Sequence, residues 1–304
     1  MHYISKLVNT MGNLQDFLSI TQYDIFIICL ELFYVISLIV LFLKSSNILF
    51  DIDLPRLKAE QYNMYVYSVI CIITVSFLLV SGVISREAQE SPLGELINLV
   101  SYSVLGLSSL LIRRAINSSG RYGSQITNQL YNGNIAAFIY HTSQIFCTSL
   151  VASFSIRSFY GENMAYIMFI IVAAEIVVSS IMQVYNTIFY RQYGLLIEQA
   201  VVKKDWHVAL QTTTFRLLAS TSICISSMLV LIAQNMFLLS LCILLLTSMI
   251  IMILILGLVT ISWKLFLKKD TSMHLIDPSQ NGVYCIQHFL LYMTICIFIT
   301  FIIT

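Results

Sequence analysis

Three charged side chains, Glu31, Glu175 and Arg216, stand inside long apolar stretches of this 304-residue chain. A charge at membrane depth is costly, so each of them needs a partner, a water-filled cavity or a function. Glu175 and Arg216 lie about 15 and about 9 residues from the same end of neighbouring apolar stretches, an axial offset of about 9 Å for helices. Three interpretations stay open: an ion pair between Glu175 and Arg216, extension of Arg216 to the membrane surface, or a conducting or proton-relay role for Glu175 or Glu31.

A second set of polar side chains recurs at one depth in the apolar stretches. His141, Thr212 and His288 each stand seven positions after an Asn or Asp that begins such a stretch. With its neighbours, this polar belt comprises His141, Gln144, Gln211, Thr212, Gln287 and His288. The belt lies about 10 Å inside the helix ends. It either hydrogen-bonds between helices or lines a constriction in which histidines titrate near neutral pH and act on an ion or proton.

Several classes of site have no signal in the sequence. There is no Gly-rich phosphate loop, no His-Glu-x-x-His zinc helix and no Gly-x-Ser-x-Gly elbow. The seven cysteines lie in apolar stretches without metal or redox spacing. A net charge of +1 with no basic stripe excludes a nucleic-acid partner. The sequence therefore predicts a protein that is not an enzyme and has no catalytic residue, metal or cofactor.

The elements that position these side chains are apolar runs. Hydrophobic residues make up 58% of the chain and charged residues 10%, against roughly a quarter charged in soluble domains. Runs of about 20 residues match the ~30 Å hydrocarbon core when helical, and lipid-exposed backbone must satisfy its own hydrogen bonds. We predict an all-α integral membrane protein with eight transmembrane helices, at about 23–43, 63–84, 93–112, 134–156, 164–190, 207–233, 237–263 and 283–303.

Four polar residues mark a repeat. Asn63, Asn134 and Asp205 are spaced 71 positions apart, Asn281 follows 76 later, and each opens an apolar run. Such a period indicates a duplicated unit. Asn and Asp are helix N-cap residues, although a contact with a substrate or ion stays open. The prediction is four tandem parallel helical hairpins, at about 23–84, 93–156, 164–233 and 237–304, in one membrane domain of residues 23–304.

Charge and pattern orient the chain. The connections within the four hairpins carry twelve Lys or Arg residues, against three on the opposite side. The positive-inside rule makes these connections cytoplasmic and places both termini on the other face of an inner, or plasma, membrane. Residues 1–22 have apolar positions at helical spacing, which predicts an amphipathic segment on the membrane surface, with a frayed tail as the alternative.

The run Asn134-Ile135-Ala136-Ala137 resembles the repeat motif of the YjfL-like family of bacterial inner-membrane proteins of unknown function. Members consist of tandem two-helix repeats whose second helix opens with Asn and small residues, usually in two units. This chain looks like four units and departs from the motif elsewhere, since Met64 follows Asn63 and Asp205 replaces Asn. The resemblance implies an accessory membrane component of envelope-stress gene clusters and supplies no catalytic residues.

Two functions follow from these observations. The first is a structural or accessory subunit of a membrane assembly, whose partners are the lipid bilayer and other membrane proteins or further copies of itself. The second is a channel or transporter for an ion, a proton or a small solute, which uses the polar belt with Glu31 or Glu175. A tightly packed interior favours the first function, and a water-accessible passage that touches the belt favours the second.

Overall fold

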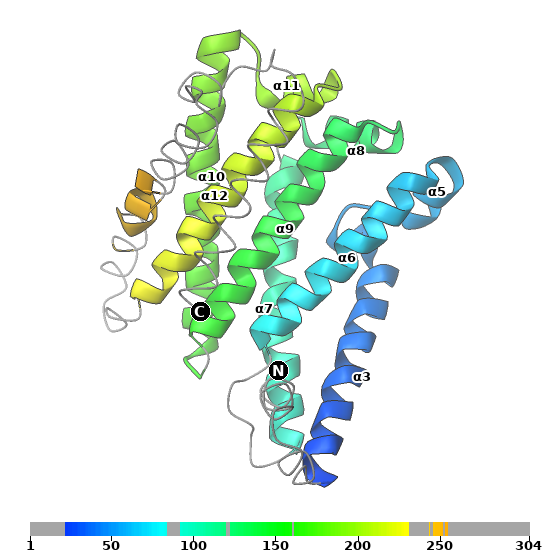
Figure 1. Cartoon of the computed structure of the whole chain (residues 1–304), viewed down its shortest axis with the longest axis vertical. Helices are drawn as coiled ribbons and strands as arrows, with labels where there is room; N and C mark the ends of the chain where they lie inside the picture. The colour runs from blue at the N-terminus through cyan, green and yellow to red at the C-terminus, as the bar shows by residue number, and fades with distance from the viewer. Residues whose placement is uncertain are drawn as a thin grey trace, which may run out of the picture.

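The computed structural model describes residues 22–83, 92–119, 122–159 and 161–230, with short pieces at 243, 246–251 and 253–254. These residues are almost entirely helical (Figure 1). The helices are α3 (Gln22–Lys44), α4 (Ser46–Leu49), α5 (Leu54–Glu60), α6 (Tyr62–Val83), α7 (Pro92–Ser119), α8 (Gly123–Tyr131), α9 (Ile135–Ser158), α10 (Met164–Tyr193), α11 (Ile197–Val202) and α12 (Trp206–Val230).

Four of the described helices are long and apolar enough to cross a membrane. Their stretches are Tyr62–Leu79, Leu96–Ile116, Ile135–Ser158 and Met164–Arg191. The first six predicted runs coincide with the six long helices α3, α6, α7, α9, α10 and α12. The predicted surface segment 1–22 and the runs 237–263 and 283–303 lie almost wholly outside the described residues, as do Asn281, Gln287 and His288.

Helix α9 is the centre of the packing. It lies between α6 and α12 with α7 behind it, and its main contacts are with these three helices (Figure 1). The α9 face toward its neighbours carries small side chains, including Ala137, Ser149 and Ala152, which are fully buried. Small residues let helix backbones approach closely, which is how membrane helices gain packing energy. The polar residues of α9 are therefore held inside the molecule.

Two of the long helices begin at the predicted cap residues. The Asn134 side chain accepts hydrogen bonds from the backbone N–H groups of Ala136 and Ala137, at 3.0 and 3.3 Å. The Asp205 carboxylate accepts from those of His207 and Val208, at 3.1 and 3.2 Å. Each satisfies donors that the first helical turn leaves free. The N-cap assignments of Asn134 and Asp205 are confirmed.

The connection before each of these caps has the same backbone form. Gly133 and Lys204 both adopt the left-handed conformation, with φ of 72° and 68°. The next residue, Asn134 or Asp205, then donates its N–H to the carbonyl five positions earlier, at 3.0 and 3.1 Å. Glycine takes a positive φ without steric cost, whereas lysine loses about 1–2 kcal/mol there. The turn places each cap at the start of its long helix.

The cap predicted at Asn63 is wrong. Helix α6 begins at Tyr62, so Asn63 is its second residue. Gln61 is the residue with non-helical backbone, φ −145° and ψ 81°, and its carbonyl accepts the Tyr65 N–H at 3.0 Å. Helix α5 runs almost directly into α6, without the left-handed turn that precedes α9 and α12. The equivalent of the cap residue is therefore absorbed into the helix.

The short helices α5, α8 and α11 lie at one end of the molecule, and α8 contacts both α5 and α11 (Figure 1). Tyr131, the last residue of α8, fixes the loop before α5: its hydroxyl accepts the Asp53 N–H at 2.7 Å, and the Arg56 guanidinium lies 4.4 Å from its ring centre. Burial raises the pKa of the Tyr131 hydroxyl above its ordinary value. The connecting segments therefore form a packed layer over the ends of the long helices.

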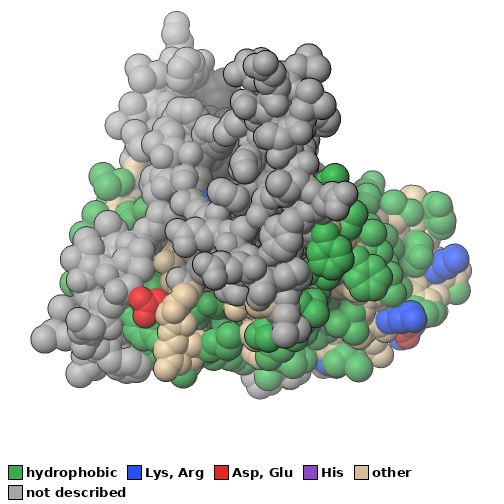
Figure 2. Space-filling view, turned by 90° about the horizontal axis from the view of Figure 1, so that it is seen from below, with side chains coloured by type: hydrophobic (Ala, Val, Ile, Leu, Met, Phe, Trp, Pro, Cys, Tyr) green, Lys and Arg blue, Asp and Glu red, His purple; other side chains and the backbone are tan. Residues whose placement is uncertain are grey.

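The outer faces of the long helices are strongly apolar. Phe33, Ile36, Ile176 and Val184 are each at least 59% exposed. Seen from below, the visible described surface is mainly hydrophobic, with Lys and Arg side chains at one edge (Figure 2). Apolar surface of this extent is unfavourable in water and marks a face that contacts lipid or another protein. These faces therefore suit a lipid environment.

Candidate functional site

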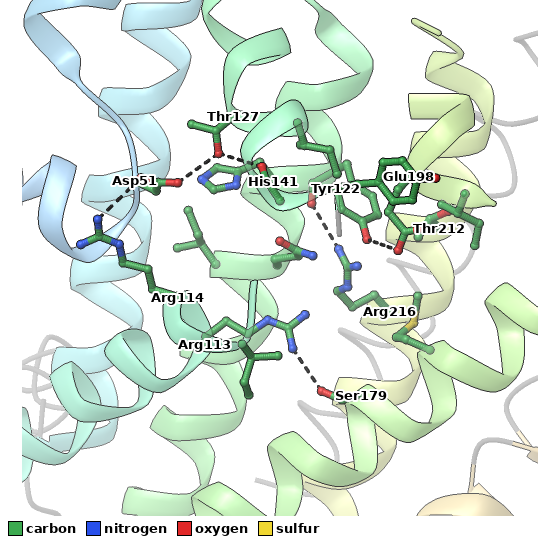
Figure 3. A pocket seen from close by; sticks show the side chains of 18 of the residues that line it. Asp51, Arg113, Arg114, Tyr122, Thr127, His141, Ser179, Glu198, Thr212 and Arg216 are labelled. Atoms are coloured by element: carbon green, nitrogen blue, oxygen red, sulfur yellow. Dashed lines mark hydrogen bonds and ion pairs between the residues drawn. The ribbon is translucent and has the colours of Figure 1, made fainter. Parts of the chain in front are cut away.

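A cavity of about 640 Å³ lies at the end of the helices where α8 and α11 sit. Its walls come from α4, α7, α8, α9, α10, α11 and α12, and from the loop after α4; Figure 3 shows side chains of this lining. Five charged residues and one histidine line it: Asp51, Arg113, Arg114, His141, Glu198 and Arg216. Apolar side chains such as Leu110 and Met182 complete the walls. Its size is that of a cavity for a small-molecule ligand.

Arg113 of α7 forms a buried ion pair with Glu175 of α10. The Arg113 Nη1 and Glu175 Oε2 atoms are 3.6 Å apart, and the side chains are 9% and 3% exposed. The same Nη1 donates to the Ser179 hydroxyl at 3.2 Å, and the Thr148 hydroxyl donates to the carboxylate. Buried charges need such partners to offset the loss of hydration. The pair and its hydrogen bonds join α7, α9 and α10.

The predicted ion pair between Glu175 and Arg216 is therefore corrected: Glu175 pairs with Arg113. The prediction counted Arg113 with the connection after its apolar run. Helix α7 continues to Ser119, however, which places Arg113 inside the helix with its side chain turned to α10. The axial offset between Glu175 and Arg216 was compatible with pairing, but it said nothing about the direction in which either side chain leaves its helix.

Arg216 of α12 binds the backbone and side chains of α9. Its Nη1 donates to the Ser143 hydroxyl at 2.7 Å and to the Tyr140 carbonyl at 3.2 Å. Its guanidinium carbon lies 4.7 Å from the Tyr140 ring centre, within range of a cation–π interaction. The residue is 2% exposed. Among the described residues no carboxylate lies within ion-pair distance of Arg216, so its direct contacts are hydrogen bonds and the Tyr140 ring.

The rim of the cavity contains a second, weaker ion pair. Arg114 and Asp51 are 3.7 Å apart, and both side chains are more than one third exposed. Asp51 also accepts from the Thr127 hydroxyl at 3.0 Å, and Arg114 donates to the Ile48 carbonyl. Exposed pairs contribute little to stability, at most about 1 kcal/mol. This group instead fixes the position of the loop that forms one wall.

Two further polar groups face the cavity from α9 and α11. His141 is buried, and its Nε2 lies 2.7 Å from the Phe50 carbonyl oxygen. Because a carbonyl only accepts, Nε2 carries the proton of that bond. Glu198 accepts from the Tyr140 hydroxyl at 3.5 Å and from the Asn186 amide at 3.3 Å.

Part of the predicted polar belt meets at this cavity. His141, Gln144 and Thr212 all line it. Gln211 and Glu31 are not among the lining residues, and Glu31 is buried in α3. Thr212 returns its hydroxyl bond to the Val208 carbonyl of its own helix at 2.7 Å. Of the described belt residues, His141, Gln144 and Thr212 therefore belong to the cavity wall and Gln211 does not.

Sequence reasoning missed the most distinctive wall residues, Arg113, Arg114 and Glu198. The adjacent arginines at the end of an apolar run were a usable signal, because a helix that extends beyond its apolar run carries such side chains inward. Within the described residues, no three His, Cys, Asp or Glu side chains come together as metal ligands.

Comparison with known proteins adds no relative. No protein-family model matches the chain, no curated protein matches it, and no solved structure matches it. The resemblance to the YjfL-like family stays a prediction from the sequence.

Proposed function

We propose that this chain is an integral membrane protein that binds a small polar solute or ion in the cavity beneath α8 and α11 and moves it across the membrane. The observation that carries the proposal is the cavity itself, in which charged and hydrogen-bonding side chains converge at the ends of strongly apolar helices. Buried charges such as those of Arg113 and Arg216 are costly without a partner or a function. A cavity among packed helices is the usual place for a transported solute.

The proposal includes the membrane arrangement. Eight spans form four parallel hairpins, and the connections that carry twelve cations face the cytoplasm, so the cavity opens toward that side. The matching turns and caps before α9 and α12 support the duplicated unit. The common placement of α5, α8 and α11 at one end supports the parallel direction of the hairpins (Figure 1).

The cavity favours a transporter over an accessory subunit. An accessory role requires only a packed interior and outer faces for lipid or partner proteins. His141, Gln144 and Thr212 of the belt border open space instead. A solute in the cavity would therefore contact side chains of the belt directly, which a fully packed belt would not allow.

A thiol-blocking experiment tests the proposal. Ser124 and Gln125 are neighbouring exposed residues of α8, but only Ser124 lines the cavity. The purified full chain carrying Ser124→Cys or Gln125→Cys is reconstituted in liposomes, and fluxes of protons, chloride, phosphate and acetate are measured before and after a bulky thiol reagent. We expect the reagent to block a flux in Ser124→Cys and to spare it in Gln125→Cys and the unmodified chain. Absence of flux for every probe, or equal loss in both variants, would reject the transport function and favour the accessory one.

A further inference from the structure

The cations deep in the cavity outnumber their carboxylate partners. Arg113 and Arg216 both line it, and among the described residues Glu175 lies within ion-pair distance of Arg113 but not of Arg216. Arg216 forms no ion pair with any described carboxylate, although it is 2% exposed. Glu198, on the α11 wall, is only half-buried and takes its hydrogen bonds from Tyr140 and Asn186. The buried group of Arg113, Glu175 and Arg216 therefore has a formal net charge of +1.

Both buried arginines also keep hydrogen-bond capacity. The Nε atoms of Arg113 and Arg216 are buried and have no hydrogen-bond partner among the described residues. A guanidinium presents five N–H groups in a planar fork. Arg216 uses Nη1 for its bonds to the Tyr140 carbonyl and the Ser143 hydroxyl and makes a further side-chain hydrogen bond with Tyr140, whereas its Nε stays without a described partner. A buried cation with unfilled donors is destabilising by itself. An anionic acceptor in the cavity would satisfy both the charge and the geometry.

We infer that the solute carries an oxyanion, a carboxylate or phosphate group, which Arg216 binds with support from Arg113. The inference rests on the proposed function, because it names the class of solute that the cavity takes. Guanidinium groups bind these oxyanions through paired N–H donors, which a spherical ion cannot use as well. The apolar walls at Leu110 and Met182 leave room for a body beyond the anionic group.

Arg216 is the better anchor of the two arginines. Arg113 already forms an ion pair with Glu175 at 3.6 Å. Arg216 is fixed in place by its hydrogen bonds to Tyr140 and Ser143 and by the Tyr140 ring, so little side-chain entropy is lost when a ligand binds it. Arg114 stands at the exposed rim and is paired with Asp51. A change at Arg216 should therefore weaken anion binding most.

The test measures binding by the full chain in phosphatidylcholine nanodiscs. Inorganic phosphate and acetate are titrated by calorimetry, with uncharged glycerol as the comparison. We expect saturable binding of at least one of the two anions, weakened about 10- to 100-fold in Arg216→Gln, as loss of a charged hydrogen-bonding group implies. Arg216→Lys keeps the charge but not the fork and should also weaken binding about tenfold or more. The matched control is Arg191→Gln, which removes an exposed charge from α10 outside the cavity.

Two lipid compositions distinguish the source of the oxyanion. Nanodiscs with equal amounts of phosphatidic acid and phosphatidylcholine present lipid phosphates to the cavity. Reduced phosphate or acetate binding in these discs, relative to phosphatidylcholine alone, identifies a lipid headgroup as the ligand. Unchanged binding identifies a free solute, and both results support the inference.

Three results would overturn it. The first is glycerol binding as strong as anion binding. The second is anion binding that is the same in Arg216→Gln, Arg216→Lys and the unmodified chain. The third is no anion binding at all. A flux that labelling at Ser124→Cys blocks, without any effect of Arg216→Gln, would reject this inference and leave the transport function standing. Anion binding that depends on Arg216, without any flux, would do the reverse.

Discussion

Breaking the buried ion pair between Arg113 and Glu175 should lower the free energy of unfolding more than any substitution on the surface. At 3.6 Å, two unit charges attract by about 5 kcal/mol at the effective dielectric constant of ~20 that suits protein sites. Removing one partner forfeits this attraction and leaves the other charge buried. We expect Glu175→Leu or Arg113→Met alone to lower the free energy of unfolding by about 3–5 kcal/mol.

Replacing both partners should cost much less. Arg113→Met with Glu175→Leu removes both charges and keeps apolar volume, so neither charge of the pair is left buried without its partner. Such a double change is often neutral, or costs less than about 1.5 kcal/mol. The two single changes then sum to at least about 4.5 kcal/mol more than the double change, which is the signature of direct coupling.

The assay is reversible unfolding of the purified chain in mixed micelles, followed by helical circular dichroism. The control is the same cycle with Arg216→Met in place of Arg113→Met. Arg216 bonds to Tyr140 and Ser143 instead of Glu175, so its coupling to Glu175 should be the weaker one. Additive effects in the Arg113 cycle, or stronger coupling in the Arg216 cycle, would refute the pairing described here.

Three other changes test local features. Asn134→Ala removes a buried N-cap and the hydrogen bond from the Asn134 side-chain amide to α11, and should lower the free energy of unfolding by about 2–3 kcal/mol. Asn163→Ala removes an exposed cap with one hydrogen bond and should lower it by about 1 kcal/mol or less. Gly133→Ala should cost about 1–2 kcal/mol, because φ is 72° there, and a value near zero would mean that the turn can relax. Tyr131→Phe should cost about 1–3 kcal/mol through the orphaned loop N–H. Burial raises the Tyr131 pKa, so as pH rises the unfolded chain loses the hydroxyl proton before the folded chain does. The free energy of unfolding of the unmodified chain should therefore fall as pH rises above about 10. The fall should be less steep in Tyr131→Phe, which lacks this proton.

The positions of the helices could be predicted from the sequence because they depend on local patterns. Apolar runs of membrane length have no alternative but helix, and the caps at Asn134 and Asp205 act within one turn of their own residues. Asn63 occupies the same place in the 71-residue spacing and still fails, because the short helix before it lacks the left-handed turn. A cap needs a chain reversal before it, which the identity of one residue does not supply.

The partners of buried charges could not be predicted in the same way. Spacing along a run fixes the depth of a residue, and depth alone made Arg216 a match for Glu175. Pairing also depends on the rotation of each helix about its axis, which is set by packing among α7, α9, α10 and α12. The cavity is harder still to predict, since seven of the described helices and a loop contribute to its walls.

Under the proposed repeat, comparing residues 71 positions apart distinguishes residues needed for the helical hairpin from residues that belong to the cavity. Cap positions keep their chemistry 71 residues apart, as Asn134 and Asp205 do. The buried charges do not: the position 71 before Arg216 is Ile145, and the position 71 before Glu175 is Val104. Equivalent helices therefore pack with an apolar residue at these places, so packing of the hairpin does not require the charge. Arg216 is thus a buried charge at a position where the preceding copy has the apolar Ile145, and its side chain lines the cavity. A buried charge that packing does not need, at the wall of a cavity, is expected for a residue that binds a ligand.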